Sequence, residues 1–168
     1  QPCRALENAG YEVTWLGVDA DGRVRIPELA AALRDETVLV TVMFANNEIG
    51  TIQPVAELAR IAHDRGAIVH TDAVQSVGKI PVDVRALGID LLSLSAHKFN
   101  GPKGAGALWI KRGTRMQPLL TGGRHERNRR SHAPVDRTAA LSRSAAAAHA
   151  AKLRATRAGD GAGVVLVE

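Results

Sequence analysis

The sequence predicts an α/β fold in three layers, with helices on both faces of a mostly parallel sheet. Strand-like and helix-like segments alternate along the chain up to about residue 111. Two of the strand-like segments, residues 37–45 and 67–74, are nearly continuous runs of apolar and β-branched residues. Such runs are typical of strands that are buried on both faces. The alternation also implies right-handed crossovers, which place consecutive strands parallel to each other.

The first three elements are expected within residues 2–34. Residues 2–10 read as the end of a helix that Gly10 closes, because glycine readily adopts the left-handed conformation that ends many helices. Residues 11–18 alternate as strands do. Residues 26–34 predict a helix with Pro27 in its first turn, where the missing N–H of proline costs no hydrogen bond.

The other elements begin at residue 37. The buried runs 37–45 and 67–74 flank an amphipathic helix over residues 54–66, which has Pro54 at its start and Gly66 at its end. Three shorter elements complete the alternating part: a short helix at 84–89 and strands at 90–97 and 106–111.

From about Met116 the pattern changes. We therefore expect residues 1–115 to be the central part of a larger domain, and residues 116–168 to be a basic loop and an alanine-rich helical tail, divergent or truncated. The last ten residues suggest one more strand, for which the sequence shows no partner. The chain starts without Met or a signal-peptide pattern, so we expect it to begin inside a longer protein.

Composition narrows the classes of function. An apolar fraction of 45% and a charged fraction of 23% are typical of a globular protein, and no apolar run approaches the roughly 20 residues that span a membrane. The single cysteine excludes a disulfide framework and a cysteine-built metal site, which suits the cytoplasm. The net charge of +5 is densest in residues 124–130. No aromatic residue is interleaved there for base stacking, so we do not expect nucleic-acid binding. We also expect no metal site.

Polar side chains gather where three of the predicted strands end. In a parallel sheet, ligands bind beyond the carboxyl ends of the strands, so these side chains are expected to converge on one crevice. Each alone has a structural explanation, because an Asp after a strand commonly serves a turn or a cap. The set consists of Asn46, Asn47, Glu48, Asp72, Gln75, Ser95, His97 and Lys98.

These residue types suit pyridoxal 5′-phosphate. The cofactor needs a lysine amine for a Schiff base and a carboxylate that keeps its pyridine nitrogen protonated, which Lys98 and Asp72 can supply. Ser95 and His97 can donate hydrogen bonds to its phosphate. The amide of Gln75 is the kind of donor that its phenolic oxygen needs.

The segment "SAHKFNGPKGAG" has three interpretations: a phosphate loop, a lysine nucleophile, or an ordinary turn between strands. It lacks the spacing of a P-loop and does not open a helix, so its glycines are better interpreted as a tight turn. Lys98 fits the nucleophile better than Lys103, because Lys98 stands at the strand end beside Ser95 and His97.

Four motifs, "NNEIGTIQP", "HTDAVQSVGK", "SAHKFNGPKG" and "GGRHERNRRS", resemble the cysteine desulfurases of iron–sulfur cluster assembly. These are pyridoxal-phosphate enzymes of the aminotransferase class V group, and the resemblance runs from about residue 3 to residue 131. It implies the large domain of a fold-type I pyridoxal-phosphate enzyme. It also implies a homodimer that moves sulfur from L-cysteine to an enzyme cysteine, with L-alanine as the product. A sulfur acceptor or an iron–sulfur scaffold protein would be its partner.

The resemblance gives roles to six residues. Lys98 would be the catalytic Schiff-base lysine, Asp72 would pair with the pyridine nitrogen, and Gln75 would contact the phenolic oxygen. The other implied contacts are those of Ser95 and His97 with the phosphate and of Asn47 with the phenolic oxygen and the substrate.

The chain also departs from the family pattern. Cys3 matches nothing catalytic, and the family's persulfide cysteine and substrate-carboxylate arginine lie downstream of residue 168. His132 and Ala133 replace a Gly-Thr pair whose threonine reaches the partner subunit's phosphate. We therefore expect low or no activity from this chain alone. Two alternatives stay open: another class V enzyme such as a selenocysteine lyase, and a non-catalytic fragment for binding or dimerisation.

Overall fold

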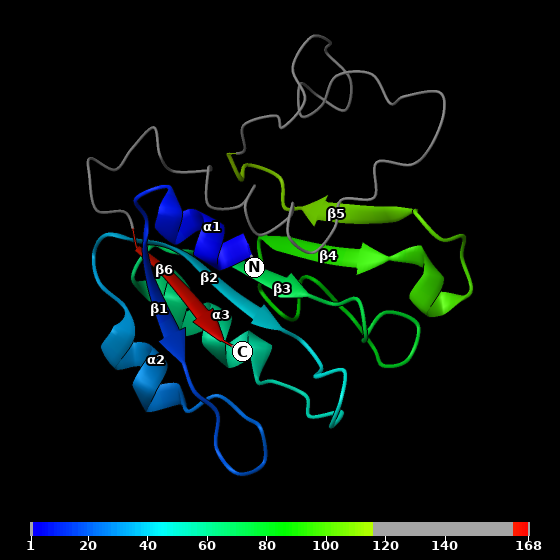
Figure 1. Cartoon of the computed structure of the whole chain (residues 1–168), viewed down its shortest axis with the longest axis horizontal. Coiled ribbons are helices and arrows are strands. Elements are labelled where there is room, and N and C mark those ends of the chain that lie inside the picture. Colours follow the sequence, from blue (N-terminus) through cyan, green and yellow to red (C-terminus); the bar gives the residue numbers. More distant parts are fainter. Residues whose placement is uncertain (1, 116–162, 168) are drawn as a thin grey trace, which may run out of the picture.

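The computed structural model describes residues 2–115 and 163–167 (Figure 1). The strands of these residues form one sheet in the order β1-β6-β2-β3-β4-β5. All neighbouring strands run parallel except β4 and β5, which are antiparallel. The mostly parallel sheet that the sequence predicts is thus confirmed. The strands are β1 (Glu12–Leu16), β2 (Thr37–Met43), β3 (Ile68–Asp72), β4 (Leu91–Ser95), β5 (Gly106–Ile110) and β6 (Gly163–Val167).

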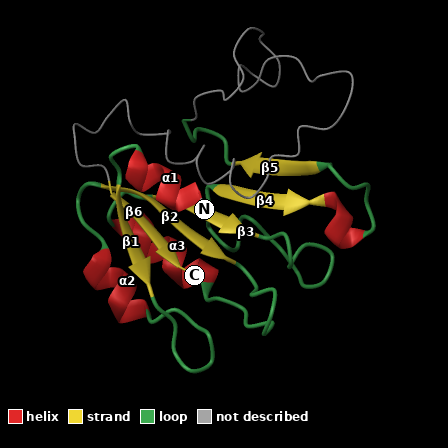
Figure 2. Ribbon diagram, viewed as in Figure 1, coloured by secondary structure: helices red, strands yellow, loops and turns green. Residues whose placement is uncertain are grey.

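Helices cover both faces of this sheet (Figure 2). The helices of the described residues are α1 (Pro2–Asn8), α2 (Ile26–Ala32) and α3 (Val55–Asp64). Leu29 of α2 and Leu58 of α3 share a core cluster with Val40 of β2. Leu6 of α1 belongs to a second cluster, with Leu39 of β2. Because neighbouring residues of a strand point to opposite faces, α1 lies on one side of the sheet and α2 and α3 lie on the other.

The central strands and their helix form as their sequences indicate. Six of the seven residues of β2 are buried, which agrees with its continuous β-branched run. α3 begins directly after Pro54, and Gly66 follows its end with a φ of +72°. Glycine adopts this left-handed conformation without steric cost, so the chain can turn there into β3.

Two elements differ from the sequence prediction. The last strand, β6, has partners on both sides, because it lies between β1 and β2 and its Val165 is 1% exposed. Residues 84–88 form a turn and not a helix. The carboxylate of Asp83 accepts hydrogen bonds from the N–H groups of Arg85 and Ala86, and Gly88 has a φ of +66°. The segment thus has an N-terminal cap and a left-handed glycine so close together that no regular helix fits between them.

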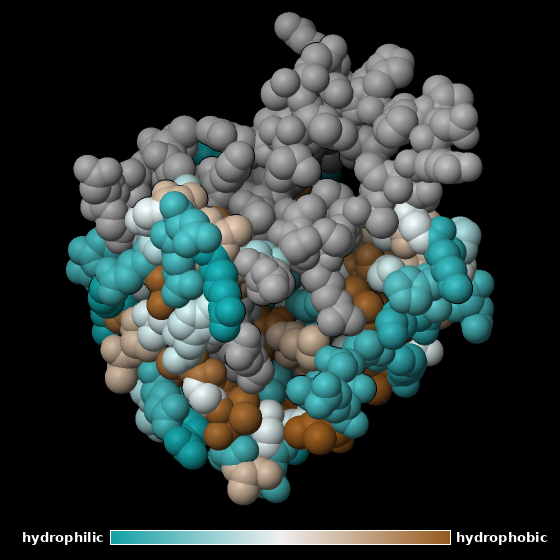
Figure 3. Space-filling model, in the orientation of Figure 1, coloured by the Kyte–Doolittle hydropathy of each residue, from teal (hydrophilic) through white to brown (hydrophobic). Residues whose placement is uncertain are grey.

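Several expectations concern residues outside the described ranges. The alanine-rich helix and the arginine cluster at 124–130 belong to these, so the division at residues 115 and 116 stays a prediction. Within the described residues, no helix is long and apolar enough to cross a membrane. Figure 3 shows exposed apolar atoms among polar ones on the viewed face, and the exposed large apolar residues include Ile49 and Ile52.

Candidate active site

The carboxyl ends of β2, β3 and β4 lie side by side, on the side of the sheet where the parallel strands end. Met43, the last residue of β2, is in register with Asp72, the last residue of β3. Asp72 is in register with Ser93 of β4. The three segments that carry the predicted site residues therefore leave the sheet as neighbours, as the sequence predicts.

Asp72 is held at this edge by its backbone and its carboxylate. Its carbonyl oxygen accepts a hydrogen bond from the N–H of Phe44 at 2.8 Å, and the next residue, Ala73, donates to the carbonyl of Ser93 at 2.9 Å. Oδ1 of Asp72 accepts from the N–H of Val74 at 2.9 Å. The carboxylate is partly buried, so its orientation depends on the strand end and not on a mobile surface loop.

The segment after β4 carries Lys98. β4 ends at Ser95, and a 3-10 helix over Ala96–Phe99 follows it, so the predicted continuation of this strand to His97 is wrong. A turn replaces it, because the N–H of Gly101 donates to the carbonyl oxygen of Ala96 at 2.8 Å. Ser95 Oγ lies 2.8 Å from His97 Nδ1, so the two predicted phosphate ligands are hydrogen-bonded to each other.

A glycine is required at the end of this turn. A Cβ atom added to Gly101 would lie 2.7 Å from the Cβ of Ala96 and 3.0 Å from its carbonyl oxygen. Asn100, just before it, has a φ of +67°, which Asn tolerates better than most residues. The glycine turn inferred from the sequence thus has a steric basis here, and it closes the 3-10 helix that positions Lys98. Lys103 lies beyond this turn and is exposed.

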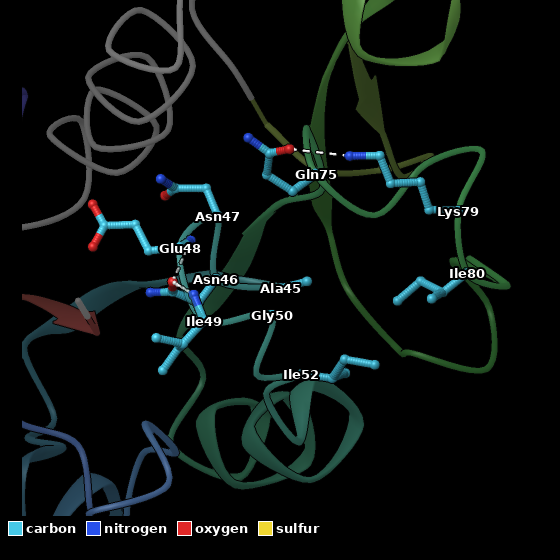
Figure 4. A pocket seen from close by; sticks show the side chains of 10 residues that line it. All are labelled: Ala45, Asn46, Asn47, Glu48, Ile49, Gly50, Ile52, Gln75, Lys79 and Ile80. Carbon is cyan, nitrogen blue, oxygen red and sulfur yellow. Dashed lines mark hydrogen bonds between the residues drawn. The ribbon is translucent and has the colours of Figure 1, made fainter.

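A pocket of about 400 Å³ opens beside the end of β2 (Figure 4). It contains two of the six predicted site residues, Asn47 and Gln75, while the other four belong to the neighbouring strand ends of β3 and β4. Its lining residues are Ala45, Asn46, Asn47, Glu48, Ile49, Gly50, Ile52, Gln75, Lys79 and Ile80.

Asn46 shapes the wall of this pocket. Its Oδ1 accepts hydrogen bonds from the N–H groups of Glu48 at 2.8 Å and Ile49 at 3.1 Å. Its own N–H donates to the carbonyl of Thr51 at 2.9 Å. The side-chain oxygen of Asn46 is thus used by the turn, whereas no hydrogen bond joins the Asn47 side chain to another of the described residues.

Two features of the site region were not predicted from the sequence. Lys79 Nζ donates to Gln75 Oε1 at 3.2 Å. Within the sheet, the His70 ring is hydrogen-bonded to two hydroxyl groups. Its Nδ1 lies 2.7 Å from Thr41 Oγ1, and its Nε2 lies 3.3 Å from Ser93 Oγ. Burial lowers the pKa of His70 to about 4, so the ring is neutral near pH 7. The spacing of four between Gln75 and Lys79 was the only available signal for the first contact.

A cluster of titratable side chains lies at the other side of the sheet, where the parallel strands begin. Asp90 accepts hydrogen bonds from His63 Nε2 at 2.7 Å, Lys111 Nζ at 3.2 Å and the N–H of Val69 at 2.9 Å. Burial alone would raise the pKa of Asp90, but these donors outweigh it and lower that pKa. Because Asp90 directly precedes β4 and binds Val69 of β3, this cluster stabilises the amino ends of these strands. It takes no part in the candidate site.

The sequence matches the family model described as aminotransferase class-V over residues 1–147. The chain belongs to the aminotransferase class-V family. Within this family, it is 55% identical over 131 residues to the cysteine desulfurase IscS of Dictyoglomus turgidum, an alignment that covers 78% of this chain and 33% of that protein. It is 56% identical over 129 residues to the cysteine desulfurase IscS of Methanosarcina thermophila, covering 77% of this chain and 32% of that protein. The resemblance to cysteine desulfurases is thereby confirmed.

Solved structures agree with the similarity to cysteine desulfurases. The solved structure of a NifS-like protein superposes with a TM-score of 0.74 at 39% identity, covering 88% of this chain and 39% of that one. A structure of SspA in complex with cysteine superposes with a TM-score of 0.73 at 36% identity, covering 88% of this chain and 41% of that one. The chain spans about a third of the length of the curated relatives it matches. The fold class predicted from the sequence is confirmed.

Proposed function

We propose that this protein is a pyridoxal-phosphate-dependent cysteine desulfurase, which takes sulfur from L-cysteine and leaves L-alanine. One observation carries the proposal: the 3-10 helix presents Lys98, together with the hydrogen-bonded pair Ser95 and His97, beside the strand end that holds Asp72. The high identity to cysteine desulfurases supports it, and the solved relative with bound cysteine supports L-cysteine as the substrate.

The side chains at the edge of the sheet fit the cofactor by their chemistry. When bound, pyridoxal phosphate supplies an electron sink for bond cleavage in an amino-acid substrate. The Asp72 carboxylate would hold a proton on the pyridine nitrogen, and the hydroxyl of Ser95 and the imidazole of His97 would bind the phosphate. Lys98 would hold the cofactor and move a proton at its Nζ. Asn47 and Gln75 would donate hydrogen bonds from the side of the pocket.

Sulfur uptake requires a thiol that can move. The one cysteine of this chain, Cys3, lies in α1 and is 3% exposed. It is therefore unsuited to receive sulfur from a substrate at the carboxyl end of the sheet. We propose that the thiol acceptor is supplied from outside residues 1–168, by the natural protein at its full length or by a partner protein. We also propose a homodimer in the cytoplasm, as the resemblance implies.

Product analysis tests this function. The natural protein at its full length is incubated with pyridoxal phosphate, L-cysteine and a thiol reductant, and alanine and sulfide are measured. We expect equal amounts of both products, with loss of both in Lys98→Ala and retention of both in the matched control Lys103→Ala. Absence of alanine would overturn the proposal. Turnover of L-selenocysteine with none of L-cysteine would assign the protein as a selenocysteine lyase.

A further inference from the structure

Lys79 and Gln75 form a contact that no step of the proposed function uses. Lys79 Nζ donates to Gln75 Oε1 at 3.2 Å, and both side chains line the pocket beside β2. Figure 4 shows the amide oxygen of Gln75 turned toward Lys79 and its amide nitrogen turned away from it. Among the described residues, none accepts a hydrogen bond from that nitrogen.

The chemistry of the two groups allows only one orientation of the Gln75 amide in this contact. A lysine ammonium can donate hydrogen bonds but cannot accept them, whereas an amide has an accepting oxygen at one end and a donating NH₂ at the other. The Gln75 oxygen must therefore face Lys79. The NH₂ group is then left as the end that can meet a ligand.

The backbone holds Lys79 in place for this task. The N–H groups of Lys79 and Ile80 both donate to the carbonyl oxygen of Ser76 at 3.0 Å. Gly78 has a φ of +80°, and a Cβ atom added to it would lie 2.9 Å from the Cβ of Phe99. Because Phe99 ends the 3-10 helix that carries Lys98, the turn of Lys79 packs directly against the segment of the candidate nucleophile.

We propose that Lys79 is a positioning residue that fixes the direction of the Gln75 amide, so that its NH₂ group faces the phenolic oxygen of pyridoxal phosphate. This inference rests on the proposed function, since it needs the cofactor in the site. With the amide reversed, its oxygen would face the phenolic oxygen and repel it. Lys79 thus acts on the cofactor through Gln75 and does not touch it.

The bound cofactor itself reports the orientation of the amide. A hydrogen bond from Gln75 stabilises negative charge on the phenolic oxygen, so a proton shared with that oxygen is released at lower pH. Loss of this hydrogen bond raises the pH at which the visible spectrum of the bound cofactor changes. A purely structural role for Lys79 would leave this pH unaltered.

Three substitutions at Lys79 separate the possibilities in the natural protein at its full length. Lys79→Arg keeps a donor, so we expect the dissociation constant of pyridoxal phosphate and the spectral midpoint to stay as they are. Lys79→Met releases the amide and weakens cofactor binding about fivefold, the value of one ordinary hydrogen bond. Lys79→Glu accepts hydrogen bonds from the NH₂ group and reverses the amide, so it gives the larger loss and the larger shift to high pH. Lys79 is exposed, so these variants are expected to fold.

Two controls complete the experiment. Arg112→Glu makes the same change of charge at an exposed residue just after β5, where the parallel strands begin. It should alter neither the dissociation constant of pyridoxal phosphate nor the spectral midpoint. In a Gln75→Ala background, Lys79→Glu should have no further effect, because the group through which it acts is gone.

The outcomes distinguish this inference from the proposed function. If Gln75→Ala weakens binding and shifts the spectrum but Lys79→Glu behaves like Arg112→Glu, the role of Lys79 is overturned and the function stands. The role is equally overturned if Lys79→Glu acts as strongly in the Gln75→Ala background. If Gln75→Ala itself changes nothing, the contact of Gln75 with the cofactor is wrong. Loss of the function would instead appear as absence of Lys98-dependent alanine.

Discussion

His70 lies 2.7 Å from Thr41, with Nδ1 of the buried ring meeting the hydroxyl of the neighbouring strand. On its other side, Nε2 lies 3.3 Å from the hydroxyl of Ser93. The side chains of Thr41, His70 and Ser93 thereby link β2, β3 and β4. His70 lies two residues before Asp72, so the two side chains are on the same face of β3. This row of polar groups ties together the three strands whose ends form the candidate site.

The buried His70 predicts a loss of stability in acid. Its folded-state pKa of about 4 lies below the ordinary value of 6.5, so the unfolded chain binds a proton that the folded chain does not. This contribution is complete above pH 6.5 and is lost as the pH falls toward 4. We expect the free energy of unfolding to fall by about 2 to 3 kcal/mol from this source between pH 7.5 and pH 4.5.

Urea unfolding at a series of pH values measures this effect. His70→Gln keeps hydrogen-bonding groups but does not titrate, so its free energy of unfolding should depend less on pH in this range. His97→Gln, at an exposed histidine, is the control and should follow the unaltered protein. Equal pH dependence in all three proteins would show that His70 is protonated as easily in the folded state as in the unfolded state.

Lys98, and not Lys103, is predicted to hold the cofactor. The 3-10 helix places Lys98 next to Ser95 and His97, whereas Lys103 lies beyond the turn at Gly101 and is exposed. Borohydride reduction of the loaded protein, followed by peptide mapping, locates the pyridoxyl group. A label on Lys103 with none on Lys98 would contradict the assignment.

Substitution of Asp72 by Asn is predicted to separate cofactor binding from turnover. The amide keeps a hydrogen-bonding group but lacks the charge that would hold the pyridine proton. We expect partial cofactor binding, measured by absorbance, and a decrease in the turnover number of about 10²- to 10³-fold, as for other electrostatic stabilisers. Unchanged turnover in this variant would remove Asp72 from the mechanism.

Gly101→Ala is predicted to displace the segment of Lys98. The new Cβ would stand 2.7 Å from Ala96, so the 3-10 helix must shift. We expect the free energy of unfolding to fall by about 1 to 3 kcal/mol, together with weaker cofactor binding. Gly17→Ala is the matched control, because nothing lies within 4 Å of its added Cβ. Similar stability and binding in both variants would show that the turn tolerates a side chain.

Residues 1–168 by themselves are predicted to release little or no alanine from L-cysteine, even with pyridoxal phosphate present. The chain contains Asp72 and Lys98, but its one thiol is buried in α1. Without a positioned thiol the reaction forfeits the advantage of proximity, which can reach about 7–11 kcal/mol of the barrier. The measurement compares this chain with its Lys98→Ala variant and with free cofactor. Alanine release that depends on Lys98 and exceeds that of free cofactor would contradict the prediction.

The parts of the fold that sequence predicts well are those with local causes. β2 follows from its β-branched run, and α3 follows from Pro54, Gly66 and the apolar stripe between them. The strand ends carry the polar residues that the sequence places after each buried run, so the neighbourhood of Asp72 and Ser95 could be anticipated from topology rules alone.

The parts that it misses depend on distant partners. β6 pairs with strands more than a hundred residues earlier in the chain, and no local sequence pattern predicts this pairing. The links from His70 to Thr41 and Ser93 likewise depend on strand order and register, which become known only once the sheet is assembled. The turn at 84–88 was mistaken for a helix because its composition resembles one, while the cap at Asp83 and the close glycine at Gly88 limit its length.

The position of β6 has a consequence for how the chain reaches its folded state. A ribosome releases β1 and β2 long before residues 163–167, yet these two strands touch the same late strand and are joined through it. Until that strand arrives, β1 has no neighbour in the order of the described sheet, and one edge of β2 stays open to pairing with other chains. Such distant pairing slows folding, because the loop must close before its contacts form. Among the described strands, the one that comes latest in the sequence is therefore inserted between two of the earliest.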